Sequence, residues 1–530
     1  MDSSSRVTSV DALSSQDAFV RTMKGLTYQY SDMMSQWTKM LTDAADFALS
    51  HPANVLATTL PVEMTRGCLQ YAGRNFGPHE KHEFNFDLSD QKVRKQIAKD
   101  TGIDEASALA RTIDGEPVDV EIEVVDEQSF GNLKHLKILD HDGNEHAEPR
   151  PPLLIISPMS GHFDTLLTDT VHRMMQDYDV YVTDWKNAKH IPLEEGEFGL
   201  SDYTSYLKDK WLPMINMRHQ PEGTDEDNIA QTVHTLAVCQ PGVSLLAATA
   251  MMSEDESPHT PASVTMMGSP IDTQVSSGSV NEFAEQHDMD WFRKNTISTT
   301  GPIYDGAGRD VYSGTGQLLG FMSMNKEKHE QGFKDMAVGM AFAPWNDAVD
   351  ALGLDHVSVG DGDKAESIAA FYDEFLTVGD LSAKFYLETI EAVFKEHHMA
   401  NGSFKHTDPE TQESRIVDLS AITHTALFTV EGENDDITGR GQTSAAHDLA
   451  PNIPDDMRQH LEQEKVGHYG LFSGTGWRQG IAPEIIDFTR RVDEANGLNY
   501  HMSTEQENTL TQAGLLNGVS ERREEADLAL

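Results

Sequence analysis

The sequence predicts an α/β fold in which helices cover both faces of a mostly parallel sheet. The run 153–156 is entirely apolar, as expected of a strand that is buried on both faces. Further short apolar runs alternate with segments of helical spacing, which is typical of parallel strands joined by helices. The apolar runs lie at 180–182, 233–238 and 263–267, and the helical segments lie near 165–178 and 203–217.

Additional segments surround this core. The chain has 530 residues, of which 38% are hydrophobic, so it can bury one large core or divide into two or three domains. Apolar and acidic residues alternate over 118–124, which predicts a half-buried strand before the core. The next apolar strand after 263–267 is 425–430, and the intervening stretch of about 150 residues is far longer than a connecting loop.

These patterns predict six parts along the chain. They are a disordered start (1–15), an N-terminal helical extension (16–117), a first core part (118–271), an inserted lid (272–422), a second core part (423–496) and a flexible tail (497–530).

Composition limits the partners and the compartment. There are 40 Lys and Arg against 87 Asp and Glu, a net charge of −47 that makes nucleic acid a poor partner. No apolar run approaches the ~18–20 residues of a membrane span, and the start of the chain lacks the pattern of a secretory signal. The two cysteines, Cys68 and Cys239, suit a reducing compartment, so we expect a cytoplasmic protein.

Cys239 occupies the position of a nucleophile. It ends the apolar run 233–238 and precedes Gln240, Pro241 and a helical stretch of small residues, 243–252. A strand, a sharp turn and a helix with the reactive residue at the apex form the nucleophile turn of the α/β-hydrolase fold. The flanking positions carry Ala237 and Pro241, where that turn usually has glycines. The sequence 237–241 alone therefore also fits a buried structural cysteine.

An acid and a base follow in the order that this fold requires. Asp435 comes directly after the strand 425–430, with Asp436 as the alternative acid. His468 follows, next to Gly467 and close to Gly470, which leave room for an imidazole. We predict a Cys239–Asp435–His468 triad, although an acidic loop and a surface histidine remain possible readings of the same residues.

The oxyanion of an acyl-transfer reaction needs backbone N–H donors. The fold supplies one from the residue after the nucleophile, here Gln240, and one from the loop after an early strand, here Met159 or Ser160. The reaction requires no cofactor, and we expect no metal site.

Several segments resemble one known family, the intracellular polyhydroxyalkanoate (polyhydroxybutyrate) depolymerases. They occur in the same order over most of the chain, and the family also replaces the two glycines beside the nucleophile. The shared segments are 156–163, 181–187, 237–241, 267–272, 320–325, 371–374, 429–437 and 466–470.

This resemblance implies a function. It implies an α/β-hydrolase-type enzyme whose Cys-Asp-His triad falls on Cys239, Asp435 and His468, and which cleaves poly(3-hydroxybutyrate) through a 3-hydroxyacyl thioester. The polymer granule is then the expected partner and location, and a thiol such as coenzyme A is a plausible acyl acceptor. Trp291, Phe321 and Met322 are candidates for an apolar rim that grips the polymer, although each also fits an ordinary lid core.

Two other functions stay open at this point. A polyhydroxyalkanoate synthase also uses Cys, Asp and His but normally keeps the glycines that Ala237 and Pro241 replace. A non-catalytic granule-associated protein would suit an acidic exterior, but it would have no need of a triad.

The acidic excess leads to a prediction about salt. Negative charge is spread along the whole chain, so self-repulsion destabilises the folded state in dilute buffer. Raising KCl from about 0.1 M to about 1 M shortens the Debye length from ~10 Å to ~3 Å, so we expect the melting temperature to rise. Differential scanning fluorimetry across that range measures it. The charge predicts a protein from a high-salt cytoplasm, with an ordinary acidic protein as the alternative, and a melting temperature that falls with added KCl would contradict the high-salt hypothesis.

Overall fold

The computed structural model describes residues 119–139, 150–161, 166–221, 229–324, 326–351 and 376–498. It also describes single residues elsewhere, namely Tyr28, Leu41, Thr42, Ala45, Ala365, Ile368, Tyr372 and Tyr500. Apart from these, the predicted disordered start, the helical extension and the flexible tail lie outside the described residues.

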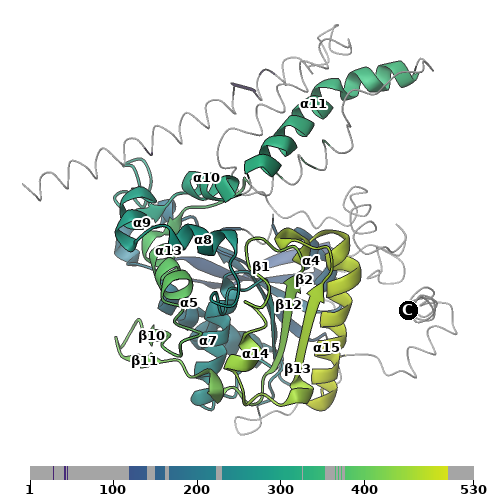
Figure 1. Ribbon diagram of the computed structural model, residues 1–530. Helices are drawn as coiled ribbons and strands as arrows, with labels where there is room; N and C mark the ends of the chain where they lie inside the picture. The colour runs from purple at the N-terminus through teal and green to yellow at the C-terminus, as the bar shows by residue number, and fades with distance from the viewer. Residues whose placement is uncertain are drawn as a thin grey trace, which may run out of the picture.

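An eight-stranded sheet forms the centre of the described chain, in the order β1-β2-β4-β3-β5-β6-β12-β13 (Figure 1). Neighbouring strands from β4 to β13 pair in parallel, whereas β2 pairs antiparallel with both β1 and β4. The strands are β1 Asp119–Glu127, β2 Gly131–Leu139, β3 Pro152–Ile156, β4 Asp179–Trp185, β5 His234–Val238, β6 Ser263–Met267, β12 Ala426–Gly432 and β13 Arg458–Gln463. The predicted mostly parallel α/β fold is confirmed.

Helices cover both faces of this sheet. One face carries α5 (Leu200–Ser205), α6 (Leu212–Arg218) and α7 (Pro241–Glu254), and the other carries α4 (Thr168–Met174) and α15 (Ala482–Ala495). Side chains of a strand alternate between the faces, so Leu154 and Ile156 of β3 join the first core and Leu153 and Ile155 join the second. Every residue of β3 is therefore buried.

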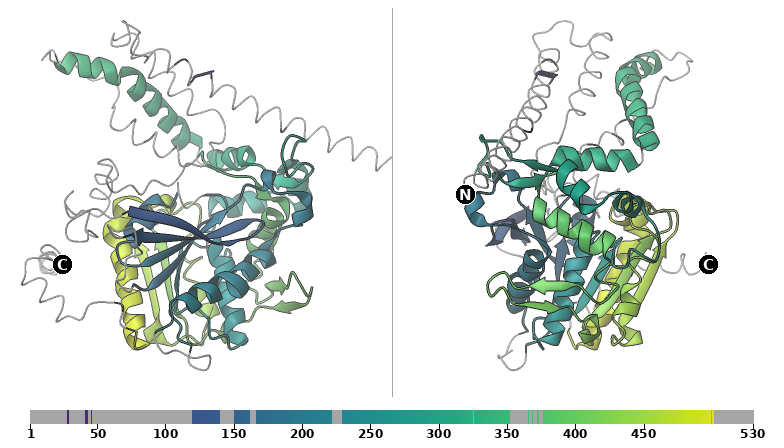
Figure 2. Two further views of the ribbon diagram at one scale, coloured as in Figure 1. Left: turned by 180° about the vertical axis from the view of Figure 1, so that it is seen from behind. Right: turned by 60° about the vertical axis from the view of Figure 1, so that its left-hand side comes forward.

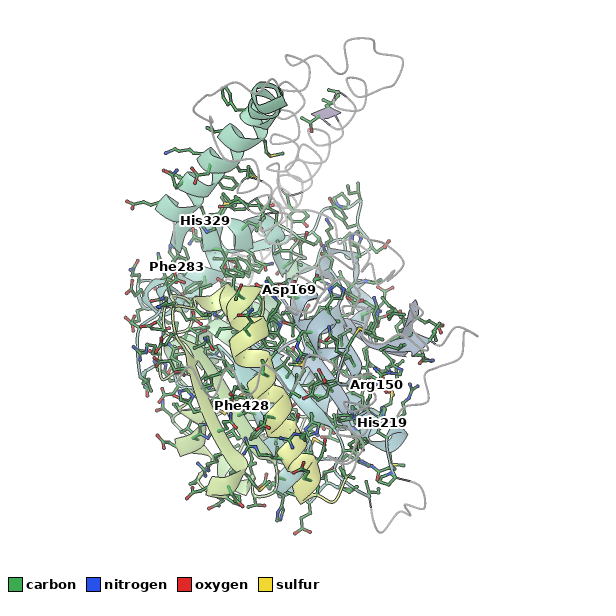
Figure 3. The ribbon with its side chains drawn as sticks, turned by 90° about the vertical axis from the view of Figure 1, so that its right-hand side faces the viewer. Arg150, Asp169, His219, Phe283, His329 and Phe428 are labelled. Atoms are coloured by element: carbon green, nitrogen blue, oxygen red, sulfur yellow. The ribbon has the colours of Figure 1, made fainter. Side chains whose placement is uncertain are left out.

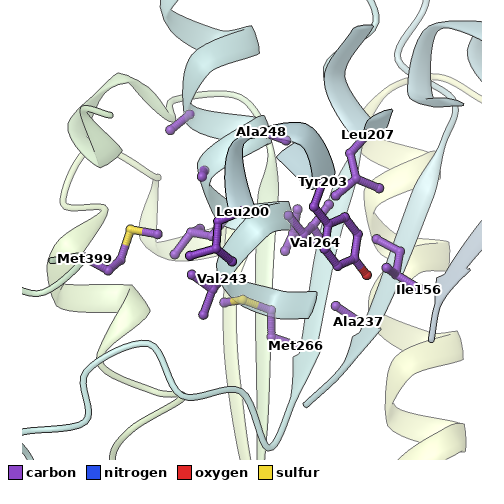
Figure 4. Close-up of a cluster of buried hydrophobic side chains, with 14 of the residues drawn as sticks. Ile156, Leu200, Tyr203, Leu207, Ala237, Val243, Ala248, Val264, Met266 and Met399 are labelled. Atoms are coloured by element: carbon purple, nitrogen blue, oxygen red, sulfur yellow. The ribbon is translucent and has the colours of Figure 1, made fainter. Parts of the chain in front are cut away.

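Figure 4 shows the first of these cores. Tyr203 and Leu207 lie over Ile156 and Ala237 of the sheet, and Val243 of α7 lies beside them. The wall that supports β5 and the start of α7 is therefore continuous apolar packing.

The second core is closed by α15. Phe428 of β12 lies beside this helix (Figure 3), and its ring centroid is 5.2 Å from that of Phe488. A buried polar contact ties the same helix to the sheet, since His234 of β5 bonds to Ser263 at 2.7 Å and to Asp493 of α15 at 3.0 Å. These residues fix β5, β6 and α15 at the end of the sheet away from Cys239.

A long insert, residues 268–425, separates β6 from β12. Its helix α11 extends away from the sheet, beyond α10 (Figures 1 and 2). The insert contains α8 Ser279–Glu285, α9 Met289–Asn295, β7 Ile297–Thr299, β8 Asp310–Tyr312, α10 Gly314–Met324, α11 Lys326–Ala351, β9 Leu381–Ser382, α13 Ala383–Thr389, β10 Lys405–Thr407 and β11 Ser414–Ile416. Strands β7, β8 and β9 form one small sheet, and β10 and β11 form another. The boundaries of the predicted lid, 272–422, stay a prediction.

The remaining elements are short. Three of them are π-helical turns within longer helices, at Tyr206–Trp211, Ile390–Lys395 and Gly476–Ile481. The others are α14 Ala446–Leu449 and the 3₁₀ turns Ala188–His190, Leu193–Glu195, Leu419–Ala421, Asp455–Met457 and His468–Leu471. Among the helices that the structure describes, none is both long and apolar enough to cross a membrane.

Strand positions agree well with the sequence patterns. The predicted strand 263–267 coincides with β6, and those at 118–124 and 425–430 correspond to β1 and β12. The pattern did not predict β13, whose sequence is mostly polar, or the small strands of the insert.

Candidate active site

The candidate site lies where neighbouring parallel strands end. The loop 157–161 follows β3, Cys239 follows β5, Gly268 follows β6, Asp435 follows β12, and His468 follows β13. These strands are adjacent in the order β3-β5-β6-β12-β13, so their carboxyl ends form one edge of the sheet. Open α/β sheets bind their ligands outside this edge.

Cys239 stands at a strained turn between β5 and α7. Its φ is 67°, in the left-handed region that a residue with a Cβ rarely adopts. The Cys239 N–H donates to the Met267 carbonyl at 2.8 Å, and the Ser269 hydroxyl donates to the Cys239 carbonyl at 2.7 Å. Gly242 is needed close by, because a Cβ there would collide with Ser269. The turn is therefore held by the neighbouring strand β6 and the loop that follows it.

Asp435 and His468 form a buried pair across two loops. His468 Nδ1 lies 2.7 Å from Asp435 Oδ2, and the two side chains are 6% and 2% exposed. The other carboxylate oxygen, Oδ1, accepts from the N–H groups of Ile437 at 3.0 Å and Thr438 at 2.9 Å. With both oxygens engaged, the carboxylate has a fixed orientation toward the ring.

The imidazole has an unusual electrostatic environment. Burial by itself would lower the pKa of His468, because it penalises the charged ring. The charges of Asp435 and Cys239, and hydrogen bonds with both, outweigh burial and raise the pKa of His468 well above its usual value. The site therefore favours an imidazolium between a carboxylate and the sulfur.

The loop after β3 forms one wall of the site. The Gly161 N–H donates to the Pro158 carbonyl at 3.1 Å, which closes a tight turn over 158–161. Ser160 and Gly161 border the pocket, whereas the Met159 side chain is buried in the core under α5 and α7. Gly161 packs against Leu166, and a Cβ there would lie 2.5 Å from that side chain.

A small pocket of about 50 Å³ opens in front of Cys239 and His468. Most of its walls are apolar. The lining residues are Pro158, Ser160, Gly161, Leu166, Val238, Cys239, Phe321, Val378, Ile437, His468, Tyr469 and Phe472. Phe321 and Val378 come from the insert and the other residues from the core.

Of the three candidate polymer contacts, the structure places one at the pocket. Phe321 of α10 lines it. Met322 packs in the apolar cluster of α10 and α11 without reaching the lining, and Trp291 of α9 packs against Phe283 and His287 on the first core. Asp436, the alternative acid, uses its carbonyl to accept from Ser279 and is not the partner of His468.

Two residues at the site were not singled out from the sequence. Gly268 has a φ of 57°, and a Cβ there would lie 3.0 Å from Cε1 of His468, so the imidazole lies directly against this glycine. Tyr469 lines the pocket and packs against both the second core and the α10–α11 cluster. The glycine stands in the run 267–272, which the resemblance included, but nothing in its spacing indicates a contact with a histidine.

Within the described part of the chain, no group of three or more His, Cys, Asp or Glu side chains is arranged to hold a metal ion. The side chains gathered at the site are of types that perform nucleophilic and acid–base chemistry.

Part of the chain matches the model of a known protein family. Residues 268–493 match the family model described as "PHB de-polymerase C-terminus". No curated protein matches the chain.

Solved structures give only weak likenesses. A carboxylesterase structure from the thaumarchaeon Nitrososphaera gargenis has a TM-score of 0.38 at 10% identity, covering 71% of this chain and all (100%) of that one. A 2-hydroxy-6-oxo-6-phenylhexa-2,4-dienoate hydrolase from Rhodococcus has a TM-score of 0.34 at 11% identity, covering 70% of this chain and 100% of that one. The fold assignment therefore depends on the strand order and on the turn at Cys239.

The strand order and the strand–turn–helix at Cys239 define an α/β-hydrolase fold. The match of residues 268–493 to the PHB de-polymerase C-terminus model confirms the resemblance seen in the sequence. Family and fold together support the class of carboxylic-ester hydrolases.

The raised pKa of His468 leads to a prediction about stability and pH. A histidine whose folded pKa exceeds its unfolded value of ~6.5 stabilises the protein fully below that value and progressively less as the pH rises toward the folded pKa. Asp435→Asn removes the charge that raises this pKa. We therefore expect the loss of unfolding free energy in Asp435→Asn to be largest near pH ~6 and to shrink toward pH ~9.

Urea unfolding of both proteins at several pH values measures this difference. Asp487→Asn, on the exposed side of α15, serves as the control and is expected to show no such trend. A deficit in Asp435→Asn that grows as the pH rises would contradict the assignment of the charged pair.

Proposed function

We propose that the protein hydrolyses the ester bonds of poly(3-hydroxybutyrate), with Cys239 as nucleophile, His468 as base and Asp435 as its orienting acid. The single observation that carries the proposal is the His468–Asp435 hydrogen bond of 2.7 Å beside a thiol on a strained turn. Nδ1 of the ring is engaged by Asp435, so Nε2 is the nitrogen that serves Cys239.

The first half of the reaction forms a thioester. The Cys239 thiolate, paired with the His468 imidazolium, attacks the carbonyl carbon of a polymer ester. The oxyanion is stabilised by the backbone N–H of Gln240 and by one N–H from the loop at Met159 and Ser160. As the tetrahedral intermediate collapses, His468 returns its proton to the leaving 3-hydroxyl oxygen, and a 3-hydroxyacyl group stays on the sulfur.

The second half releases the product. Neutral His468 takes a proton from a water molecule, which attacks the thioester carbonyl and frees a 3-hydroxy acid while the thiolate leaves. Asp435 stabilises the imidazolium that forms in each half. A thiol such as coenzyme A could take the place of water, because a thiol can attack the thioester carbonyl in the same way and release a new thioester.

The polymer granule is the proposed partner and location. The family match on residues 268–493 supports this, and the apolar pocket suits an uncharged polyester. A synthase would run the same thioester chemistry toward polymer, and incubation with 3-hydroxybutyryl-CoA separates the two, because only a synthase produces polymer from it.

Replacing the proposed nucleophile provides the direct test. We expect Cys239→Ala to lose release of 3-hydroxybutyrate from amorphous granules by at least about 10³-fold, because the covalent route is removed. Intact-mass measurement of the wild-type protein with a 3-hydroxybutyrate oligomer is expected to show added 3-hydroxybutyryl units, and Cys239→Ala is expected to show none.

Cys68→Ala, which removes the other cysteine, is the matched control and is expected to keep both the activity and the adduct. Hydrolysis that continues unchanged in Cys239→Ala would overturn the proposed mechanism.

The lid side of the pocket limits the size of the acyl unit. The pocket is about 50 Å³, against the ~300–1,000 Å³ of drug-sized ligand sites. Phe321 of α10 lines it, and the apolar cluster of α10 and α11 packs against this ring. We expect an acyl unit with a side chain longer than methyl to meet this ring.

Truncating that ring is expected to broaden specificity. In Phe321→Ala, the kcat/KM ratio for 3-hydroxyhexanoate over 3-hydroxybutyrate oligomers is expected to rise about 10-fold or more, the usual cost of a misplaced methylene or two. Met322→Ala, the neighbour that supports the cluster without lining the pocket, should leave this ratio unchanged. An unchanged ratio in Phe321→Ala would show that another wall sets the limit.

A further inference from the structure

Glu431 is a buried carboxylate that the proposed chemistry does not use. It lies near the end of β12, is 4% exposed, and stands on a strand whose residues are all buried. A charged group in this position needs several hydrogen bonds to offset its lost hydration. Its surroundings therefore show what it holds in place.

The carboxylate accepts three backbone N–H groups. Oε2 accepts from Gly441, and Oε1 accepts from Thr443 and Ser444, each at 2.8 Å. Between Glu431 and these residues runs the segment 433–440, which carries Asp435 and is referred to here as the acid loop. Glu431 thus fastens the far end of the acid loop to the strand from which the loop departs.

A chain of contacts leads from this anchor to the nucleophile. Thr443, whose N–H is bound by Glu431, donates its hydroxyl to the Ser269 carbonyl at 2.9 Å. Ser269 in turn donates its hydroxyl to the Cys239 carbonyl at 2.7 Å. Two residues, Thr443 and Ser269, therefore connect the Glu431 carboxylate to the strained turn at Cys239 through hydrogen bonds.

A second contact joins the acid loop to the base. Thr438 donates its N–H to Asp435 and its hydroxyl to the Gly268 carbonyl at 2.8 Å. Gly268 is the residue on which the His468 ring lies. Displacement of the acid loop would move Asp435 relative to both His468 and Cys239.

We propose that Glu431 is a positioning residue that holds the acid loop and the Cys239 turn in register, so that sulfur, imidazole and carboxylate stay aligned. It touches none of the reacting atoms and acts through Thr443, Ser269 and Asp435. The proposal rests on the roles proposed above for Cys239, Asp435 and His468.

The test uses Glu431→Gln, which keeps the size of the side chain but removes its charge and one acceptor oxygen. The matched control is Glu433→Gln, because Glu433 lies on the same loop but accepts one N–H, from Lys465, at an exposed position. Two readouts are needed, namely the steady-state kinetics with a soluble 3-hydroxybutyrate oligomer and the rate of Cys239 alkylation by iodoacetamide between pH ~5.5 and ~9.

For Glu431→Gln we expect kcat to fall about 10-fold to 100-fold with KM within about 2-fold, because the groups are misaligned while the pocket walls are unchanged. Among the described residues, the titratable groups that face His468 are Asp435, Cys239 and Tyr469, and the first two raise its pKa. Misalignment weakens that effect, so alkylation at the acidic end of the range should slow relative to the alkaline end. Glu433→Gln should follow the wild-type protein in both readouts.

A lower melting temperature together with a wild-type alkylation profile and kcat would show a purely structural role and overturn the proposal. If Glu431→Gln does not fold, Thr443→Val cuts only the link to Ser269 and is expected to change both readouts in the same direction, by a smaller factor. Unchanged readouts in Thr443→Val would then overturn it. Because alkylation needs no polymer, a shifted profile in a protein that does not cleave the polyester would reject the substrate and not the positioning role.

Discussion

The hydrogen bond between Asp435 and His468 is the interaction on which the rest of the site depends. It joins loops that leave two neighbouring strands, and it can form only if β12 and β13 are parallel and end at the same edge. Adjacent parallel strands also deliver the Cys239 turn and Gly268 to that edge. The sheet thus brings the site together, because Cys239, Asp435 and His468 lie in three separate parts of the sequence.

Burial of the Asp435–His468 pair strengthens its electrostatic interaction. Burial penalises a charged imidazole, and Asp435 and Cys239 outweigh that penalty and raise the pKa of His468. The surrounding backbone N–H groups fix the carboxylate, so the electrostatic field at the ring is set before a substrate arrives. The strained backbone at Cys239 belongs to the same arrangement, because neighbouring hydrogen bonds maintain a conformation that is unfavourable in isolation.

The insert contributes two side chains, Phe321 and Val378, to a pocket whose other lining residues lie in the core. Its apolar cluster supports Phe321 and Val378 at the pocket, and Tyr469 packs against this cluster from the residue next to His468. Movement of α10 and α11 would therefore change the pocket wall and the surroundings of His468 together. This coupling gives a physical reason for a large insert between β6 and β12.

The sequence by itself determined the main strands, because apolar runs such as 153–156 and 263–267 have no other stable place than a covered sheet. It also indicated Cys239, Asp435 and His468, since each follows a strand or stands among glycines. It did not indicate β13, an edge strand of mostly polar residues, because one partner strand is enough to form it without an apolar pattern. Only the tertiary structure decided that Gly268 supports the imidazole, that Phe321 rather than Trp291 reaches the pocket, and that Glu431 binds the residues just beyond the acid loop. Those contacts join residues far apart in the chain, and their distances depend on strand register and packing, which no local pattern contains.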